Sequence, residues 1–363
     1  MKKRIAFVIT NDPDYDQRMQ RICNSLQQHG YDVTLVGTDI RTRKKAKPAA
    51  YNIKQIHSIF TKGKLFYLEF QIKAFFKLLF LKSDAVCAID LDSILPCLIV
   101  SRLRNKKRIY DAHELFCELP EVIARPSIRK AWKFIEKISL PHFKYGYTVS
   151  ESISLEYKKM YDHDYATVRN IPVLKSETSD VKRERGYVLY QGALNEGRGM
   201  EYLIPAMQYV NLPLIICGEG NFSHKARAIV KELNLEDKVL FQGMIEPSKL
   251  AEYSLNALVG INLGDGAGLN NYLSLNNKFF DYIHAQLPQI AMDFPEFRKI
   301  NQQFEIAVLI PDLQVQTIAE AINSLIEDKT LYQKLNRNCE EAKQVLNWQE
   351  EEKKLVEFYN KLF

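Results

Sequence analysis

Short runs of β-forming residues alternate with helical patterns from one end of this chain to the other. Parallel strands have to be joined by long connections, usually helices, so this alternation predicts an α/β fold with parallel sheets. The runs predicted as strands in the first half are residues 5–10, 31–36, 52–59, 84–89, 108–111, 146–149 and 166–169. Those in the second half are residues 187–190, 213–217, 239–242, 257–262, 289–292 and 307–310.

A polar segment without periodicity, residues 175–185, separates the two sets of strands and is predicted to be a linker. We therefore predict two Rossmann-like, doubly wound domains that face each other across a cleft, the first over residues 1–174 and the second over 186–345. Residues 346–363 are predicted to form a last helix. We consider a path in which this helix crosses back to the first domain. Ligands of such folds bind at the carboxyl ends of strands, so functional residues are expected in the loops that follow them.

Composition and charge exclude several classes of protein. Hydrophobic residues make up 46% of the chain and charged residues 26%, which is typical of folded, water-soluble proteins. The formal charge of +6 is modest, and no basic cluster with stacking aromatics indicates nucleic acid binding. The six cysteines are scattered without metal-ligand spacing, as reduced core residues are. Without a signal-peptide core or an apolar run of transmembrane length, the protein is expected to be cytoplasmic.

One segment stands apart, because residues 64–82 (KLFYLEFQIKAFFKLLFLK) are strongly apolar, helical in pattern and edged with lysines. It fits a crossover helix packed on a core, and the breadth of its apolar surface favours that interpretation. It also fits a surface that touches anionic lipid or a lipid-linked acceptor. Peripheral contact with the inner face of the plasma membrane therefore stays open as the alternative.

Glycine-bearing loops follow three predicted strands of the second half. Glycines let backbone N–H groups approach an anion, and an arginine beside them can hold a diphosphate. Each loop taken alone could be a plain turn, but three such strand ends in one domain favour a nucleotide. The candidate donor-binding residues in these loops are Gly192, Arg198, Gly218, Glu219, Gly268 and Leu269.

Lys278 and Asp281 lie three residues apart near the start of the helix that follows the third loop. A lysine there can neutralise a phosphate, and a carboxylate can accept hydrogen bonds from ribose hydroxyls. The alternative is an ordinary surface ion pair.

The first half offers a histidine at a strand end. His113 follows the run RIYDA beside Asp111 and Glu114, which favours a functional histidine over one bonded into its loop. Asp16, a candidate for binding the acceptor, has the alternative role of capping the helix that follows it. The DxD patterns at 12–14, 14–16, 90–92 and 162–164 are discounted as metal sites, because the spacing is common by chance. The candidate acceptor-binding residues are Asp16, Arg18, Asp90, Asp92 and Glu114.

The second half resembles the GT-B glycosyltransferases of the retaining group called family 4. The matching segments are YQGALNEGRG, ICGEG, VLFQG and SLNNKFFDYIHAQLPQIAMD, and the first half is similar in RIAFVITNDPDYDQRMQRICNSLQQHGYDVTLVG and YDAHELFCELPE. The resemblance implies that Arg198 contacts the donor diphosphate, Asp281 the ribose, and His113 the transferred sugar. Two positions depart from the family pattern: Ala193 stands where arginine is frequent, and Leu273 where an acidic residue is expected.

The resemblance implies a glycosyltransferase that uses a nucleotide diphosphate sugar, retains the anomeric configuration and needs no metal or cofactor. His113, Arg198 and Lys278 are the expected catalytic residues, with Lys278 binding phosphate in place of the arginine that Ala193 replaces. Gly268 and Leu269 would cover the sugar. The expected acceptor is a glycan or a lipid-linked glycan in polysaccharide synthesis. The alternatives are a nucleotide-sugar epimerase and a non-catalytic sugar-nucleotide-binding protein, which Ala193 and Leu273 favour.

Overall fold

The computed structural model describes residues 2–41, 44–175 and 185–363. The chain divides into two compact units, the first made of Met1–Arg169 and Glu351–Phe363 and the second of Asn170–Glu350. Residues 170–174, which we assigned to the first domain, therefore belong to the second unit, and the chain returns to the first unit at Glu351. Residues 176–184 of the predicted linker lie outside the described residues.

The first unit is built on a seven-stranded parallel sheet. In sheet order its strands are β3 (Asn52–Ile56), β2 (Asp32–Thr38), β1 (Arg4–Val8), β4 (Ala85–Ile89), β5 (Lys107–Ala112), β6 (Tyr145–Thr148) and β7 (Ala166–Thr167). In the register, Ile5 of β1 pairs with Val33 on one side and Ala85 on the other. Each strand predicted for the first half is present, so the predicted α/β class is confirmed there.

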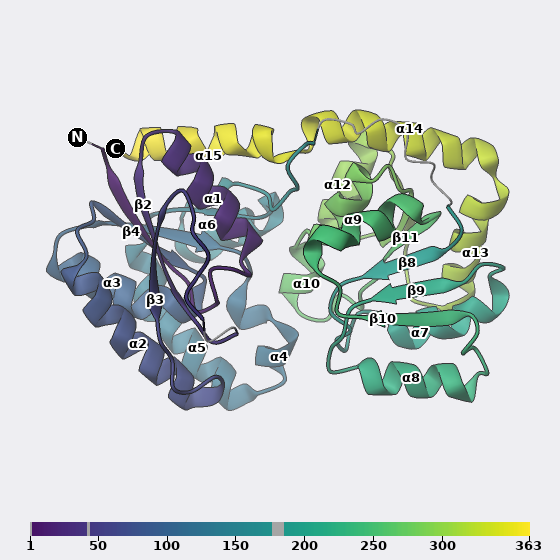
Figure 1. The fold of residues 1–363 in the computed structure, drawn as a ribbon, viewed down its shortest axis with the longest axis horizontal. Coiled ribbons are helices and arrows are strands. Elements are labelled where there is room, and N and C mark those ends of the chain that lie inside the picture. The colour runs from purple at the N-terminus through teal and green to yellow at the C-terminus, as the bar shows by residue number, and fades with distance from the viewer. Residues whose placement is uncertain (1, 42–43, 176–184) are drawn as a thin grey trace. The chain divides into compact units, whose positions relative to one another are not determined.

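Helices cover both faces of this sheet (Figure 1). On one side lie α1 (Gln17–Gln28), α6 (Glu151–Tyr161) and α15 (Trp348–Leu362). On the other lie α2 (Gly63–Phe80), α3 (Ile94–Leu103) and α5 (Pro126–Ser139). Shorter elements in the connections are α4 (Pro120–Ile123), η1 (Leu91–Ser93), η2 (Phe116–Glu118) and η3 (Leu140–His142).

The end of the chain completes the core of the first unit. The ring of Tyr359, on α15, is fully buried and lies 6.2 Å from the rings of Phe7 and Tyr147. Its hydroxyl also lies 3.3 Å from that of Tyr147. The C-terminal helix is therefore part of the first hydrophobic core from Glu351 onward.

The second unit has a six-stranded parallel sheet. In sheet order its strands are β10 (Val239–Gly243), β9 (Leu214–Cys217), β8 (Val188–Gln191), β11 (Val259–Asn262), β12 (Gln289–Met292) and β13 (Ala307–Ile310). Its helices are α7 (Met200–Ala206), η4 (Met207–Tyr209), α8 (Ser223–Glu232), α9 (Pro247–Asn256), α10 (Leu269–Leu273), α11 (Asn277–His284), α12 (Pro295–Phe304), α13 (Val315–Glu327) and α14 (Lys329–Val345). The six strands predicted for this half are present as well.

Burial explains why these runs could be recognised. Strands β1, β4, β8, β11 and β12 are almost wholly buried, as expected for parallel strands covered on both faces. The six cysteines, all within the described residues, are buried and form no disulfide. No helix in the described part of the chain has both the length and the hydropathy to span a bilayer.

Candidate active site

Each sheet has a topological switch point, where the strand order reverses and ligands of doubly wound folds bind. In the first unit it lies between β1 and β4, and in the second between β8 and β11. The loops that leave these strands are bonded to each other in both units. The Thr10 hydroxyl donates to Asp92 Oδ2 at 2.6 Å in the first, and Asp265 N donates to Gly197 O at 3.0 Å in the second.

The switch point of the first unit carries a histidine between carboxylates, which we call the His113 cluster (Asp90, Asp92, Asp111 and His113). The His113 backbone N donates to Asp90 Oδ1 at 2.9 Å. Its ring Nε2 lies 3.1 Å from Asp111 Oδ2, and its Nδ1 lies 3.6 Å from Asp90 Oδ2. The His113 side chain is only 19% exposed, so both ring nitrogens face carboxylates in a largely desolvated place.

The protonation of this cluster follows from these contacts. Burial lowers the pKa of His113, but the carboxylates of Asp111 and Asp90 outweigh it and raise that pKa to about 9. Burial raises the pKa of Asp90 to about 8 and that of Asp92 to about 6. Burial also acts to raise the pKa of Asp111, but Arg18 and His113 overcome it and lower that pKa. Near neutral pH His113 is therefore an imidazolium paired with the carboxylate of Asp111. In this form the His113 ring donates hydrogen bonds and cannot act as a base.

Two predicted acceptor-binding residues have structural partners inside the first unit. The Arg18 side chain is 3% exposed and donates to Asp111 Oδ1 at 3.0 Å and to Val168 O at 2.9 Å. It therefore supports the His113 cluster from within. Asp16 is the N-cap of α1, where its Oδ1 accepts from Met19 N at 3.0 Å, which is the alternative role considered for it.

Glu114 lies beside the cluster. It is partly buried, and its charge adds to the effects that raise the pKa of Asp90 and of Asp92. Its backbone O accepts from the Tyr157 hydroxyl at 3.3 Å. Of the five residues predicted to bind an acceptor, Asp90, Asp92 and Glu114 are thus the three gathered at the switch point.

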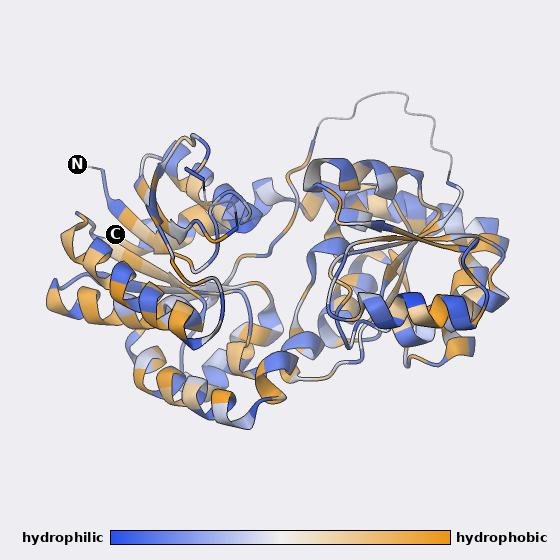
Figure 2. Cartoon of the chain, turned by 60° about the horizontal axis from the view of Figure 1, so that its bottom comes forward, coloured by the Kyte–Doolittle hydropathy of each residue, from blue (hydrophilic) through white to orange (hydrophobic). Residues whose placement is uncertain are grey.

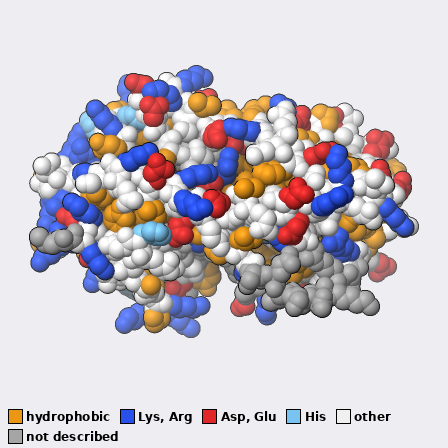
Figure 3. Space-filling view, turned by 90° about the horizontal axis from the view of Figure 1, so that it is seen from above, with side chains coloured by type: hydrophobic (Ala, Val, Ile, Leu, Met, Phe, Trp, Pro, Cys, Tyr) orange, Lys and Arg blue, Asp and Glu red, His pale blue; other side chains and the backbone are white. Residues whose placement is uncertain are grey.

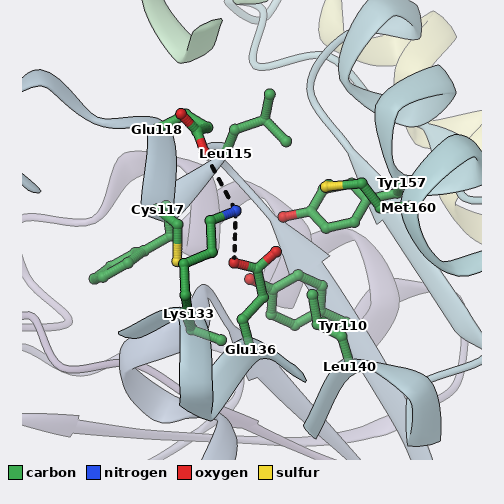
Figure 4. A pocket seen from close by; sticks show the side chains of 11 residues that line it. Tyr110, Leu115, Cys117, Glu118, Lys133, Glu136, Leu140, Tyr157 and Met160 are labelled. Atoms are coloured by element: carbon green, nitrogen blue, oxygen red, sulfur yellow. Dashed lines mark ion pairs between the residues drawn. The ribbon is translucent and has the colours of Figure 1, made fainter. Parts of the chain in front are cut away.

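A small pocket adjoins these loops (Figure 4). Lys133 points into it and lies 3.2 Å from both Glu118 Oε1 and Glu136 Oε2. The cavity volume is about 10 Å³, which is room for about one water molecule. The pocket is therefore too small for a sugar. The residues that line it are Leu91, Tyr110, Leu115, Phe116, Cys117, Glu118, Lys133, Glu136, Leu140, Tyr157 and Met160.

The second unit holds a buried amine at its switch point. Lys278 is the second residue of α11, whose N-cap Asn276 accepts from Phe279 N at 3.2 Å. Its side chain is buried, and Nζ lies 3.9 Å from the centre of the Tyr190 ring. Nζ is also 3.8 Å from where a side chain on Gly192 would begin. Among the described residues, Nζ has no hydrogen-bond partner.

The charges around this amine are positive. Burial lowers the pKa of Lys278 well below its ordinary value, and the guanidinium of Arg198 lowers it further. Arg198 also counteracts the effect of burial on Tyr190, whose pKa is raised to about 12. We call Tyr190, Gly192, Arg198 and Lys278 the amine site. An amine without a partner, whose protonated form is disfavoured by burial and by the charge of Arg198, forms a place that an anion would stabilise.

Glycines make room for that anion. Gly192 has φ +128° and follows β8 directly, and Gly218 has φ +151° after β9. A Cβ on Gly218 would lie 1.9 Å from the Gly192 carbonyl oxygen, so only glycine fits where these two loops meet. The loops are also tied by Asn195 and Asn221, since Asn221 N donates to Asn195 Oδ1 at 3.3 Å and Glu196 N to Asn221 Oδ1 at 3.0 Å.

The remaining candidates have defined partners. Asp281 Oδ2 accepts from Gln191 Nε2 at 2.9 Å, and Gln191 Oε1 accepts from the Ser254 hydroxyl at 2.9 Å. Glu219 pairs with Arg227 at 2.5 Å. Gly268, with φ +77°, precedes α10, whose first residue Leu269 is partly exposed.

Sequence reasoning missed Thr10, Tyr190 and Gln191. Each is at or just after the carboxyl end of a central strand, which was the available signal, but none carries a charge.

The structure also shows the two positions that depart from the family pattern. Ala193 is exposed, and its carbonyl accepts from the Tyr190 hydroxyl at 2.9 Å. Leu273 is buried at the end of α10.

Comparison with known proteins gives a family match in the second unit. Residues 185–328 match the family described as glycosyl transferases group 1. An uncharacterized glycosyltransferase of Methanocaldococcus jannaschii is 22% identical, with 57% of this chain and 63% of that protein covered. The chain thus spans less than two thirds of the length of this curated relative.

Solved structures match over nearly the whole chain. Sucrose-phosphate synthase from Thermosynechococcus elongatus has a TM-score of 0.85 at 17% identity, with 100% of this chain and 99% of that chain covered. Anabaena HepE in complex with UDP-glucose has a TM-score of 0.77 at 12% identity, with 99% of each chain covered. WaaG, a glycosyltransferase involved in lipopolysaccharide biosynthesis, has a TM-score of 0.73 at 13% identity, with 96% and 98% covered. At these identities the likeness establishes a shared fold.

Proposed function

We infer from these matches that the chain is a glycosyltransferase of the GT-B fold with a group 1 domain over residues 185–328, and we propose that it transfers a sugar from a nucleotide diphosphate sugar to an acceptor hydroxyl. The observation that carries the proposal is the amine of Lys278. Burial and Arg198 disfavour the protonated form of this amine, which has no partner among the described residues, and an anion bound beside it would stabilise that form. A diphosphate is such an anion, and Gly192 places no side chain beside the amine.

In the proposed reaction the bond between the anomeric carbon and the β-phosphate oxygen breaks. The nucleoside diphosphate leaves with the electron pair, and Arg198 and Lys278 stabilise its added charge. The acceptor oxygen forms the new bond to the anomeric carbon, and its proton passes to the leaving phosphate oxygen. We propose retention at the anomeric carbon, because this proton transfer places acceptor and leaving group on the same face of the sugar. Neither a metal ion nor a cofactor takes part in the proposed steps.

The other donor-binding roles follow from position. Asp281, held by Gln191, is proposed to accept hydrogen bonds from the ribose hydroxyls. Glu219, Gly218, Gly268 and Leu269 belong to the loops at the same end of the sheet and are proposed to surround the nucleotide and the sugar.

The His113 cluster is proposed to bind hydroxyl groups of the reacting sugars. Its imidazolium donates hydrogen bonds, Asp92 and Glu114 accept them, and Asp90, with a pKa raised to about 8, can do both near neutral pH. His113 is therefore proposed to orient the transferred sugar, with the proton accepted by phosphate. The acceptor is proposed to be a glycan or lipid-linked glycan and the role biosynthetic, supported by neighbours such as WaaG, which is involved in lipopolysaccharide biosynthesis.

A thermal-shift panel of UDP-, GDP- and ADP-sugars in EDTA tests the proposal on the wild type, Arg198→Ala and Lys278→Ala. Lys231→Ala, an exposed lysine of α8, is the matched control. One nucleotide class is expected to raise the melting temperature, because a ligand at 100 times its Kd stabilises the folded state by about 2.7 kcal/mol. The shift should be clearly smaller in both site variants and unchanged in the control.

Two results would contradict the proposal. The absence of a shift with every nucleotide sugar would contradict the proposed donor site. A shift that requires a divalent metal would contradict the proposed metal-free mechanism. A product assay separates the remaining alternatives: an epimer of the donor would identify an epimerase, whereas release of nucleoside diphosphate with the sugar on an acceptor identifies a transferase.

A further inference from the structure

Helix α2 presents apolar side chains on two opposite faces. One row is buried against the sheet and consists of Phe66, Phe70, Ala74 and Leu78. The other row is between 50% and 79% exposed and consists of Leu65, Leu68, Ile72, Phe76 and Phe80. Because members of each row are three or four residues apart, each row occupies one side of the helix. Packing within the first unit explains the buried row only.

The neighbouring helices extend the exposed row into a surface. α2 packs against α3, and α3 packs against α5. Between 41% and 67% of the side chain is exposed at Ile99 and Leu103 of α3 and at Phe134 and Ile138 of α5. We call these four residues and the exposed row of α2 the apolar face. Figure 2, in which the lower side of Figure 1 comes forward, shows the hydrophobic residues along these helices.

The three helices also carry the positive charge of the protein. They contain eight lysines and arginines against two glutamates, an excess of +6 that equals the formal charge of the whole chain. Both glutamates are already paired: Glu69 with Lys73 at 2.6 Å, and Glu136 with Lys133 at 3.2 Å. By contrast, Figure 3 shows basic and acidic side chains interspersed on the face seen from above.

We propose that the apolar face of the first unit docks on the surface of an anionic lipid bilayer. An apolar helix row edged by lysines is the pattern of proteins that lie in the membrane interface, where anionic headgroups attract the cations. A second copy of the chain fits this face less well, because a twofold contact would oppose two surfaces that each carry exposed lysines such as Lys64, Lys130 and Lys137. Scattered exposed apolar residues need no explanation, but nine of them on three helices that pack side by side indicate an interaction site.

The same helix touches the switch point of the first unit. Gln71 of α2 donates to Asp92 O at 2.6 Å, and Tyr67 packs edge-to-face on Trp132 with ring centres 5.5 Å apart. A bilayer at the outer row of α2 would therefore lie about one helix diameter, ~10 Å, from the loop that holds Asp92. If the proposed transferase activity holds, this placement favours an acceptor that is anchored in the bilayer.

Vesicle flotation of the full chain tests the docking. Vesicles of phosphatidylcholine alone are compared with vesicles that also contain phosphatidylglycerol, at low and high salt. Leu68→Gln/Ile72→Gln/Phe76→Gln removes apolar side chains, and Lys64→Glu/Lys130→Glu/Lys137→Glu reverses charges at exposed positions. The controls in the second unit are Tyr209→Gln/Leu240→Gln/Val345→Gln and Lys225→Glu/Lys231→Glu/Lys249→Glu, all at exposed or partly exposed positions.

The wild type is expected to float with the anionic vesicles only, and less at high salt. The Gln triple variant of α2 and the Glu triple variant of α2 and α5 should each lower the partition coefficient at least about tenfold, and neither control variant should. Equal binding by variants and controls overturns the proposal, as does wild-type protein that stays unbound. If light scattering shows a wild-type dimer that Leu68→Gln/Ile72→Gln/Phe76→Gln dissociates, the apolar face would be assigned to a second copy of the chain instead. The nucleotide-sugar thermal shift, measured on the same variants, should be unchanged, so failure of docking and failure of the donor site are distinguishable.

Discussion

The amine of Lys278 lies 3.9 Å from the centre of the Tyr190 ring, and no described residue accepts a hydrogen bond from it. The ring offers a weak attraction to the cation, but it does not make up for the loss of hydration. In the folded, ligand-free protein the protonated form of this amine is therefore disfavoured at the carboxyl end of β8. Such a site is stable only because the surrounding core holds it, and it gains most when an anion binds.

We expect Lys278→Met to stabilise the ligand-free protein while it weakens donor binding. Removal of a buried, unpaired polar group should raise the free energy of unfolding by roughly 1–3 kcal/mol. Loss of a charged hydrogen bond worth about 1.5–3 kcal/mol should weaken donor affinity about 10- to 100-fold. Urea denaturation and isothermal titration measure the two effects. Lys231→Met should change neither, and a destabilised Lys278→Met protein would show that the amine has a partner in solution.

Donor binding should be coupled to proton uptake. Since burial and Arg198 depress the pKa of Lys278, the unfolded chain binds a proton that the native protein lacks between the lowered pKa and about 10.4. Ligand-free stability should therefore rise with pH across that window. A diphosphate restores the proton to Lys278, so donor affinity should fall as the pH rises. Calorimetric titration with a nucleotide sugar, in buffers of different ionisation enthalpy, should detect up to about one proton taken up. The uptake should vanish in Lys278→Met, and equal uptake by that variant would assign the proton elsewhere.

His113 should remain protonated above neutral pH. With a folded pKa of about 9, against an ordinary value of 6.5, the group stabilises the folded state fully below 6.5, and this contribution is lost as the pH rises through 9. Histidine side-chain NMR should show its titration near pH 9, above the ordinary value of 6.5. Asp90→Asn preserves the acceptor for the His113 backbone N and should lower the pKa of His113 without abolishing its pairing with Asp111. An unchanged titration in that variant would show that Asp90 does not act on the ring.

Gly218→Ala should be far more costly than the same change at another left-handed glycine. Its Cβ would lie 1.9 Å from the Gly192 carbonyl oxygen, so the two strand-end loops must separate, at a cost of about 3 kcal/mol or more. At Gly30, with φ +88° and no atom within 4 Å of the new Cβ, only backbone strain of about 1–2 kcal/mol is expected. Chemical denaturation of both variants compares the costs. Similar losses at the two positions would mean that the loops separate easily.

Particular elements show what could be predicted. Buried runs such as Ala85–Ile89 and Gln289–Met292 were recognisable as strands, because parallel strands covered on both faces are continuously apolar. The fold class followed from their alternation with helices. Lys278 was a candidate because it begins a helix after a glycine-rich loop. The sequence could not reveal that its amine would be buried beside Tyr190, since that contact joins β8 to α11 across 88 residues.

The sequence by itself determined the strands, the crossover helices and the loops in which chemistry could occur, because local periodicity and glycine placement act over a few residues. The tertiary structure decided which side chains in those loops lack hydrogen-bond partners and which are already bonded to other parts of the protein. Arg18 became a buried support for Asp111, Asp16 a helix cap, and the second apolar row of α2 a free surface. These outcomes depend on the strand order, which sets which loops become neighbours, and that order arises from packing between segments far apart in the chain.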